Sequence, residues 1–293
     1  MFSPSFSRFS RALSTSAARL GDIQVTEAAP YVYHVKLSRP KKRNTFTLDM
    51  WKESSKVFSE LSLNPKCRSI VLSGEGKSFC AGIDIQEGMG ELMELMSSDK
   101  LDGARKARFL SEFIREAAAG YTAIAKCYKP VIAAIHSHCI GAGVDLVTAC
   151  DIRFAAKDSI FSIREVNVGL AADVGTLARI QKIVANDSLT RELAYSGRDI
   201  GADEALNYGL VSRVLPHQEA TVEAAIELAK EIASKSPIAV QGTKVNLNYG
   251  RDHTIDDSLE YVRVWNMSQL NTEDLMKSGL ALMTKEKAEF NDV

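Results

Sequence analysis

Hydrophobic residues recur with two different spacings along the chain, and each spacing predicts a different element. In residues 31–37 apolar side chains occupy every second position, which is typical of a half-buried strand. The residues on its predicted buried face are Tyr31, Tyr33, Val35 and Leu37. Residues 48–61 repeat at helical spacing, and either Thr47 or Asp49 can cap that helix. Short apolar runs predict further buried strands at residues 69–73, 131–135 and 152–155.

The order of these elements predicts the fold class. Strands alternate with helices as far as residue 215, which favours an α/β core. From Glu219 onward the pattern is helical only, and Ser236-Pro237 separates two of the helices. We therefore expect an α/β core over residues 21–215. A helical region over residues 216–293 would pack against this core or against a neighbouring subunit.

The first twenty residues differ in composition from the rest of the chain. They contain Arg8, Arg11 and Arg19 and six serines but no acidic residue, which is typical of an organelle transit peptide. A terminus that is merely disordered is the alternative interpretation. The last four residues, 290–293, do not form a peroxisomal S-K-L address. We therefore expect a transit peptide over residues 1–20 and a protein of the mitochondrial matrix rather than of peroxisomes.

Composition and spacing argue against several classes of ligand. The formal net charge of −1 favours neither nucleic acid nor an acidic membrane surface as a partner. No apolar run reaches the roughly 20 residues of a membrane span. The cysteines form no C-x-x-C pair, and we expect no metal site. Gly76-Lys77-Ser78 and Gly141-x-Gly143 lack the other glycines of a phosphate-binding loop and a dinucleotide fingerprint, respectively.

Two loops rich in small residues carry the candidate chemistry. The first follows an apolar strand, and its small residues allow another group to approach the backbone closely. The second leads from a strand into a helix, whose first N–H groups are free to bind a developing oxyanion. The residues concerned are Ala81, Gly82, Ile83, Asp84 and Ile85 in the first loop and Gly141, Ala142 and Gly143 in the second. A tight turn and an ordinary helix start are the structural alternatives.

The two loops resemble the paired loops of the enoyl-CoA hydratase/isomerase (crotonase) family. Residues 149–153 and 202–211 are also similar to that family. The resemblance implies a crotonase-like (ClpP/crotonase) spiral of ββα units with a C-terminal helical trimerisation region. It also implies an acyl-CoA substrate, no cofactor beyond the coenzyme A of that substrate, and a homotrimer or homohexamer. By position, the N–H groups of Ile83 and Ala142 would hold the thioester oxygen.

Three acidic residues follow in or after the second loop: Asp145, Glu165 and Asp173. Hydratases of the family carry glutamate at the first two places and glycine at the third. The acids of this chain match instead the branch that converts 3,5-dienoyl-CoA to 2,4-dienoyl-CoA in the β-oxidation of unsaturated fatty acids. The alternatives are an enoyl-CoA hydratase, a 3-to-2 enoyl-CoA isomerase, or a relative that keeps the fold and binds RNA or a protein.

Each acid also has an ordinary structural interpretation. Asp145 would stabilise the start of its own helix, and Glu165 would form a surface ion pair with Arg164. Asp173 would cap a helix that begins near Gly175.

The conversion of a 3,5-diene requires loss of a proton at C2 and gain of one at C6, which suits two separated carboxyl groups. Apolar neighbours of Asp173 would raise its pKa and make it a stronger base. The resemblance implies Asp173 as the base at C2 and Glu165 as the acid at C6, although the sequence alone permits the reverse. Asp145 would orient or polarise the site.

Overall fold

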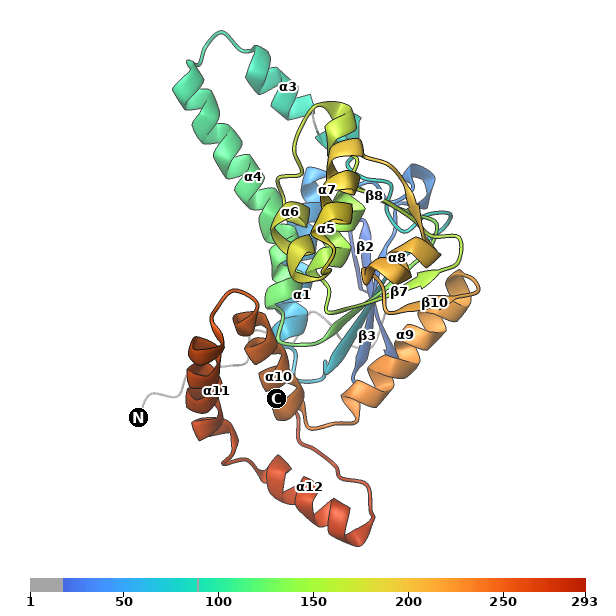
Figure 1. Ribbon diagram of the computed structural model, residues 1–293, viewed down its shortest axis with the longest axis vertical. Coiled ribbons are helices and arrows are strands. Elements are labelled where there is room, and N and C mark those ends of the chain that lie inside the picture. The colour runs from blue at the N-terminus through green and yellow to red at the C-terminus, as the bar shows by residue number, and fades with distance from the viewer. Residues whose placement is uncertain (1–17, 89) are drawn as a thin grey trace.

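A seven-stranded mixed sheet lies at the centre of the computed structural model, which describes residues 18–88 and 90–293 (Figure 1). The strand order is β1-β2-β3-β4-β5-β7-β10, in which β1 to β3 are antiparallel and the pairs from β3 onward are parallel. The strands are β1 (Ala18–Leu20), β2 (Ile23–Ala29), β3 (Val32–Leu37), β4 (Ser69–Gly74), β5 (Val131–Ile135), β7 (Ile152–Ala156) and β10 (Arg213–Leu215). The predicted α/β core is confirmed, with β2 as a strand that the hydrophobic pattern did not indicate.

A second sheet takes strands that alternate along the chain with those of the first. Its strands are β6 (His138–Ile140), β8 (Ile160–Ser162) and β9 (Ile200–Gly201). Strand β5 is followed by β6 and then by helix α5 (Ala142–Ala149), and β7 is followed by β8 and further helical segments. Isolated bridges extend this arrangement, since Cys80 after β4 pairs with Cys139 and Phe46 after β3 pairs with Ile83. The chain therefore winds as the expected spiral of strand–strand–helix units.

Side chains of the central sheet alternate between two apolar clusters. Val32 of β3 belongs to the cluster that packs against helix α9 (Gln218–Ala233). The predicted buried face of β3 belongs to the larger cluster, with Tyr33, Val35 and Leu37. Tyr31 was expected on the same face, and that prediction is wrong. It precedes the strand with a φ of 66°, and this left-handed turn places its side chain against the α9 cluster.

Helices α1 (Leu48–Leu63) and α4 (Gly103–Lys126) pack against each other beside the larger cluster. Thr47, rather than Asp49, caps α1, because its side chain accepts a hydrogen bond from the N–H of Met50 at 3.3 Å. The remaining helical segments are η2 (Pro40–Lys42), α2 (Ile85–Gly88), α3 (Gly90–Ser97), η3 (Glu165–Val168), α6 (Thr176–Arg179), η4 (Ile180–Lys182), α7 (Asp187–Ser196), α8 (Ala202–Tyr208), α10 (Pro237–Gly250), α11 (Ile255–Gln269) and α12 (Glu273–Thr284).

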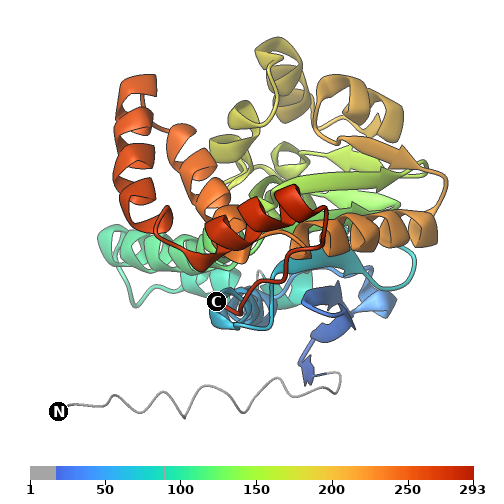
Figure 2. The ribbon, with the colours of Figure 1, turned by 90° about the horizontal axis from the view of Figure 1, so that it is seen from below.

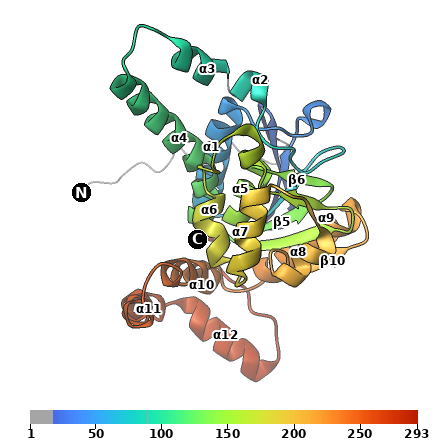
Figure 3. The ribbon, with the colours of Figure 1, turned by 45° about the horizontal axis from the view of Figure 1, so that its top comes forward.

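The predicted C-terminal helical region is divided between the core and an outlying group. Helix α9 covers the sheet, whereas α11 and α12 lie at the end of the molecule opposite to α3 (Figures 1 and 3). After α12 the chain returns to the start of β4 (Figure 2). There Arg68 donates hydrogen bonds to the carbonyl oxygens of Phe290 at 2.7 Å and Asn291 at 3.3 Å.

The predicted transit peptide over residues 1–20 falls mainly on residues 1–17, which lie outside the described part of the chain. Its last three residues form β1, which pairs with β2 and so crosses the predicted boundary. Within residues 18–88 and 90–293, no helix combines the length and the apolar character that crossing a bilayer requires.

The close contact between α1 and α4 gives a testable consequence for stability. A Cβ at Gly120 would lie 2.7 Å from the backbone oxygen of Trp51, which cannot move away without shifting α1. We expect Gly120→Ala to lower the free energy of unfolding by about 1–3 kcal/mol, because overpacking outweighs the gain of about 1 kcal/mol in helix propensity. Urea unfolding measures the change.

Gly103→Ala at the start of α4 is the matched control, since it lies in the same helix and nothing lies within 4 Å of its Cβ position. That variant should be as stable as the original chain or slightly more stable. Equal stability of Gly120→Ala and the original chain would contradict the predicted close packing.

Candidate active site

The first loop leaves one backbone N–H without a partner. Phe46 donates its N–H to the carbonyl of Gly82 at 2.8 Å, and its own carbonyl accepts the N–H of Asp84 at 2.8 Å. Ile83 lies between these two bonds, so its N–H points away from Phe46. Among the described residues nothing accepts a hydrogen bond from this N–H. The group is therefore free to bind a ligand oxygen.

The second loop supplies a corresponding N–H at the start of α5. Gly141 adopts a φ of 50° and a ψ of −110°, a backbone conformation that favours glycine. Ala142 is the first residue of the helix, and in the described part of the chain its N–H has no acceptor. Its φ is not positive, so alanine occupies this place without backbone strain. The expected second donor is thus available.

A parallel bridge between Cys80 and Cys139 holds the two loops side by side. Cys80 donates to the carbonyl of His138 at 2.9 Å and accepts the N–H of Ile140 at 3.0 Å. A Cβ at Gly143 would lie 3.0 Å from the carbonyl oxygen of Cys80, so a side chain there would force the loops apart. Ile83 and Ala142 each lie three residues after the bridged cysteine of their own loop. Their free N–H groups therefore occupy equivalent positions of the paired segments.

Glu165 places its carboxyl group against the glycine turn. A Cβ at Gly141 would lie 3.1 Å from its Oε1 atom, while Oε2 is buried and has no hydrogen-bond partner among the described residues. Burial, followed by the negative charge of Asp145, raises the pKa of Glu165 to about 7. The charge of Asp173 acts in the same direction. Arg164 pairs with Asp199 instead, so the expected surface ion pair with Glu165 is not formed.

Asp145 connects the second loop to the segment that carries Asp173. Its side chain is buried, and Oδ1 accepts the N–H of Thr176, the first residue of α6, at 2.6 Å. Burial raises the pKa of Asp145 to about 6, although the hydrogen bond from Thr176 and the charge of Arg179 oppose that rise. Asp145 therefore stabilises the start of a different helix from its own.

Asp173 is the most exposed of the three acids. It precedes Gly175, which occupies the N-cap position of α6 and provides no side-chain cap, so Asp173 does not cap this helix. Partial burial raises the pKa of Asp173. A Cβ at Gly175 would lie 1.8 Å from Nη1 of Arg179, and the φ of 151° is likewise reserved for glycine. In the described part of the chain, no other residue forms a hydrogen bond or ion pair with the Asp173 carboxylate.

The remaining predicted residues of the first loop have structural contacts. Ala81 donates its N–H to the carbonyl of Arg43 at 3.0 Å. Asp84 is buried, and its carboxylate accepts the N–H groups of Gln86 and Glu87, which caps α2. Ile85 begins α2 with an exposed side chain.

Sequence reasoning did not identify Tyr121 or Thr176 as neighbours of the site. Burial raises the pKa of Tyr121, followed by the negative charge of Asp145. Its hydroxyl accepts a hydrogen bond from Nε1 of Trp51 at 2.7 Å. Both residues come near the acids only through tertiary contacts, and no local pattern in the sequence indicates them.

The electrostatic coupling between the acids can be tested by titration. Replacing Asp145 with asparagine keeps an acceptor for the Thr176 N–H but removes the negative charge that helps to raise the pKa of Glu165. We expect Asp145→Asn to lower the pKa of Glu165 from about 7, as followed by NMR of carboxyl-labelled glutamate. An unchanged or raised pKa would contradict the arrangement.

Comparison with known proteins shows the family to which the chain belongs. A mouse (Mus musculus) protein named delta(3,5)-delta(2,4)-dienoyl-CoA isomerase, mitochondrial, is 52% identical over 90% of this chain and 80% of its own length. An Arabidopsis thaliana protein of the same name, peroxisomal, is 41% identical over 88% of this chain and 92% of its own. The crystal structure of an enoyl-CoA hydratase from Bacillus anthracis superposes with a TM-score of 0.82 at 26% identity, covering 92% and 99% of the two chains. Residues 27–293 match the family described as enoyl-CoA hydratase/isomerase, and the chain therefore belongs to that family.

Proposed function

We propose that the chain is a delta(3,5)-delta(2,4)-dienoyl-CoA isomerase that acts in the β-oxidation of unsaturated fatty acids. The observation that carries this proposal is the Glu165 carboxyl group against the second of two loops with free N–H groups, with Asp173 close enough to raise the pKa of Glu165 by its charge. The mouse and plant relatives bear the name of this activity at 52% and 41% identity. The acyl-CoA substrate is that of the enoyl-CoA hydratase/isomerase family.

The site suits a reaction in two proton transfers. A carboxylate removes a proton from C2 of the 3,5-dienoyl thioester, and the electron pair spreads into a trienolate with negative charge on the thioester oxygen and at C2, C4 and C6. The N–H groups of Ile83 and Ala142 would bind that oxygen, and one such donor typically contributes about 2.7–4 kcal/mol to transition-state stabilisation. A carboxylic acid then gives a proton to C6, which leaves the double bonds at C2 and C4. The reaction requires no redox cofactor, because it transfers only protons.

The different environments of the two carboxyl groups favour one assignment. The pKa of Glu165 is about 7, which keeps a large fraction protonated at neutral pH and suits the acid at C6. Asp173 is more exposed than Glu165, so desolvation disfavours its charged form less, which suits the base at C2. We therefore assign Asp173 to C2 and Glu165 to C6. Asp145 positions the Asp173 segment and raises the pKa of Glu165.

Hydration or a 3-to-2 enoyl shift on the same fold is the competing function. A shift between C4 and C2 of an enoyl thioester can use one carboxyl group as a shuttle, whereas a second carboxyl group serves a transfer between the more distant C2 and C6. The free carboxylate of Asp173 therefore favours the dienoyl reaction. Rapid hydration of crotonyl-CoA that depends on Glu165, with no turnover of a 3,5-dienoyl-CoA, would favour the hydratase.

The protein is mitochondrial, as is the mouse relative at 52% identity; the peroxisomal plant relative is more distant at 41% identity. We retain the transit peptide over residues 1–20 as a proposal. The Arg- and Ser-rich composition of this segment supports it.

We also infer that the chain assembles into a homotrimer or homohexamer through its C-terminal helices. Apolar side chains of α11 and α12 are exposed in the isolated chain, among them Leu259, Leu280 and Leu282. A cavity of about 500 Å³ between α10, α11 and α12 is lined partly by Leu247 and Trp265. An exposed apolar surface of this extent is typical of an interface.

Sedimentation of the purified protein tests the assembly. We expect the mass of three or six chains, and we expect Leu282→Asp to shift the distribution towards single chains because it places a charge in the apolar surface. Leu206→Asp, at an exposed leucine of α8, is the control and should leave the mass unchanged. A single-chain mass for the original protein would contradict the inference.

Substitution of the two acids tests the proposed reaction. On a 3,5-dienoyl-CoA we expect Asp173→Asn and Glu165→Gln each to lower kcat by a factor of about 100 or more, as for loss of a general acid or base. The ultraviolet absorbance of the conjugated product measures the rate. With Glu165 as the acid, the rate of the original enzyme should fall as pH rises through about 7.

Exchange with deuterated water separates the two roles. Glu165→Gln should still exchange the C2 protons, because the base remains, whereas Asp173→Asn should not. The reverse pattern, or a rate that rises through pH 7, would exchange the assignments. No isomerisation by the original enzyme would refute the function itself.

A further inference from the structure

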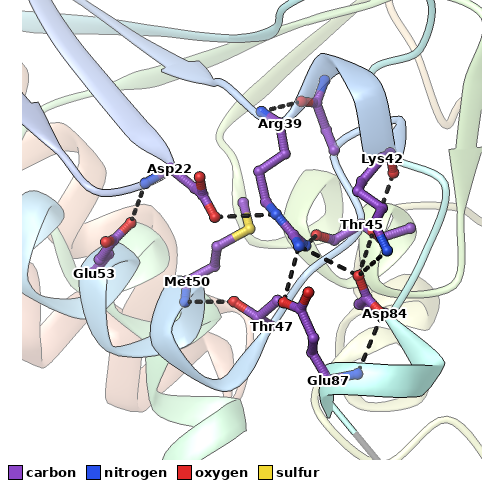
Figure 4. Close-up of polar contacts among 10 residues, drawn as sticks. Asp22, Arg39, Lys42, Thr45, Thr47, Met50, Glu53, Asp84 and Glu87 are labelled. Carbon is purple, nitrogen blue, oxygen red and sulfur yellow. Dashed lines mark hydrogen bonds and ion pairs between the residues drawn. The ribbon is translucent and has the colours of Figure 1, made fainter.

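A buried arginine links the first loop to three other segments of the chain. The side chain of Arg39, only 10% exposed, follows β3 and contacts three carboxylates and one carbonyl (Figure 4). Nε lies 3.0 Å from Oδ2 of Asp22, and Nη1 donates to the carbonyl oxygen of Thr45 at 2.7 Å. Nη2 donates to Oε2 of Glu87 at 2.9 Å and to Oδ2 of Asp84 at 3.3 Å. Each of the three guanidinium nitrogens therefore has at least one partner.

Two of these contacts are made with residues whose backbone orients Ile83, namely Thr45 and Asp84. Asp84 follows Ile83 directly, and its N–H bonds to the carbonyl of Phe46, while Thr45 precedes Phe46. The guanidinium thus fixes both strands of the short bridge that turns the Ile83 N–H away from Phe46. Asp84 in turn caps α2, so its carboxylate cannot move without disturbing the helix start.

We propose that Arg39 is a positioning residue for the oxyanion hole, which acts through Asp84 and Thr45 to hold the Ile83 N–H in the direction of the thioester oxygen. A planar guanidinium suits this task because it donates several hydrogen bonds in fixed directions, whereas a lysine provides one ammonium group on a flexible stem. Small errors in the position of an oxyanion donor reduce transition-state stabilisation more than they reduce ground-state binding.

The experiment compares Arg39→Gln with the original enzyme in two measurements. With a 3,5-dienoyl-CoA we expect kcat to fall roughly 10- to 100-fold with little change in KM, since one oxyanion donor is worth about 100- to 1,000-fold and is displaced rather than deleted. Isotope-edited infrared spectroscopy of an unreactive bound acyl-CoA reports the polarisation of the thioester carbonyl. Arg39→Gln should lose much of the lowering of the carbonyl frequency that the original enzyme produces.

Companion variants separate positioning from general stability. Arg39→Lys should restore part of kcat and part of the frequency shift. Asp84→Asn leaves Arg39 paired with Asp22 and Glu87, so it tests the same link in a folded protein even where Arg39→Gln fails to fold. Combining Arg39→Gln with Asp84→Asn should cost little more than Arg39→Gln alone, because loss of the guanidinium already removes its contact with Asp84. Arg191→Gln, which removes an exposed ion pair with Asp187, is the control and should behave like the original enzyme.

The outcomes distinguish this inference from the proposed function. The kcat measurement rests on the proposed function, whereas the infrared measurement does not. Normal kcat and carbonyl frequency in Arg39→Gln, or in Asp84→Asn, would overturn the positioning role, and so would a loss confined to thermal stability. If the original enzyme does not isomerise dienes but still polarises a bound thioester, and the variants lose that effect, the function fails while the role of Arg39 stands.

Discussion

The site depends on the close pairing of two loops from different turns of the spiral. The bridge between Cys80 and Cys139 brings them together, and Gly143 permits the approach because any side chain there would meet the carbonyl oxygen of Cys80. With the loops in register, the N–H groups of Ile83 and Ala142 have no hydrogen-bond acceptor among the described residues. A rigid pair of donors of this kind stabilises developing negative charge without reorganising during the reaction.

The acids above these loops are held in an environment that disfavours their charged forms. Burial raises the pKa of both Glu165 and Asp145, and each negative charge near Glu165 raises it further. Arg179 acts on Asp145, and Arg164 is engaged with Asp199, so neither neutralises Glu165. The fold thereby keeps a proton available on one carboxyl group near neutral pH while the more exposed Asp173 is free to ionise.

Polar contacts between residues far apart in the sequence fix the geometry around both loops. Asp145 joins α5 to the start of α6, and Arg39 joins the end of β3 to Asp84 in the first loop. These bonds connect segments that the spiral brings together from separate units. The reacting groups and the groups that position them therefore come from different parts of one continuous core.

The sequence by itself determined the α/β core and several of its strands and indicated the two loops, because periodicity and small-residue turns are local signals. The three acids were predicted through the resemblance of those loops to the family. It placed Tyr31 on the wrong face, since a left-handed turn before β3 leaves no trace in the alternation. Only the tertiary structure decided that Asp145 caps α6, that Asp173 caps nothing and that Arg39 holds the first loop. Those contacts join residues distant along the chain, and their pairing is set by packing of the spiral, not by any local pattern.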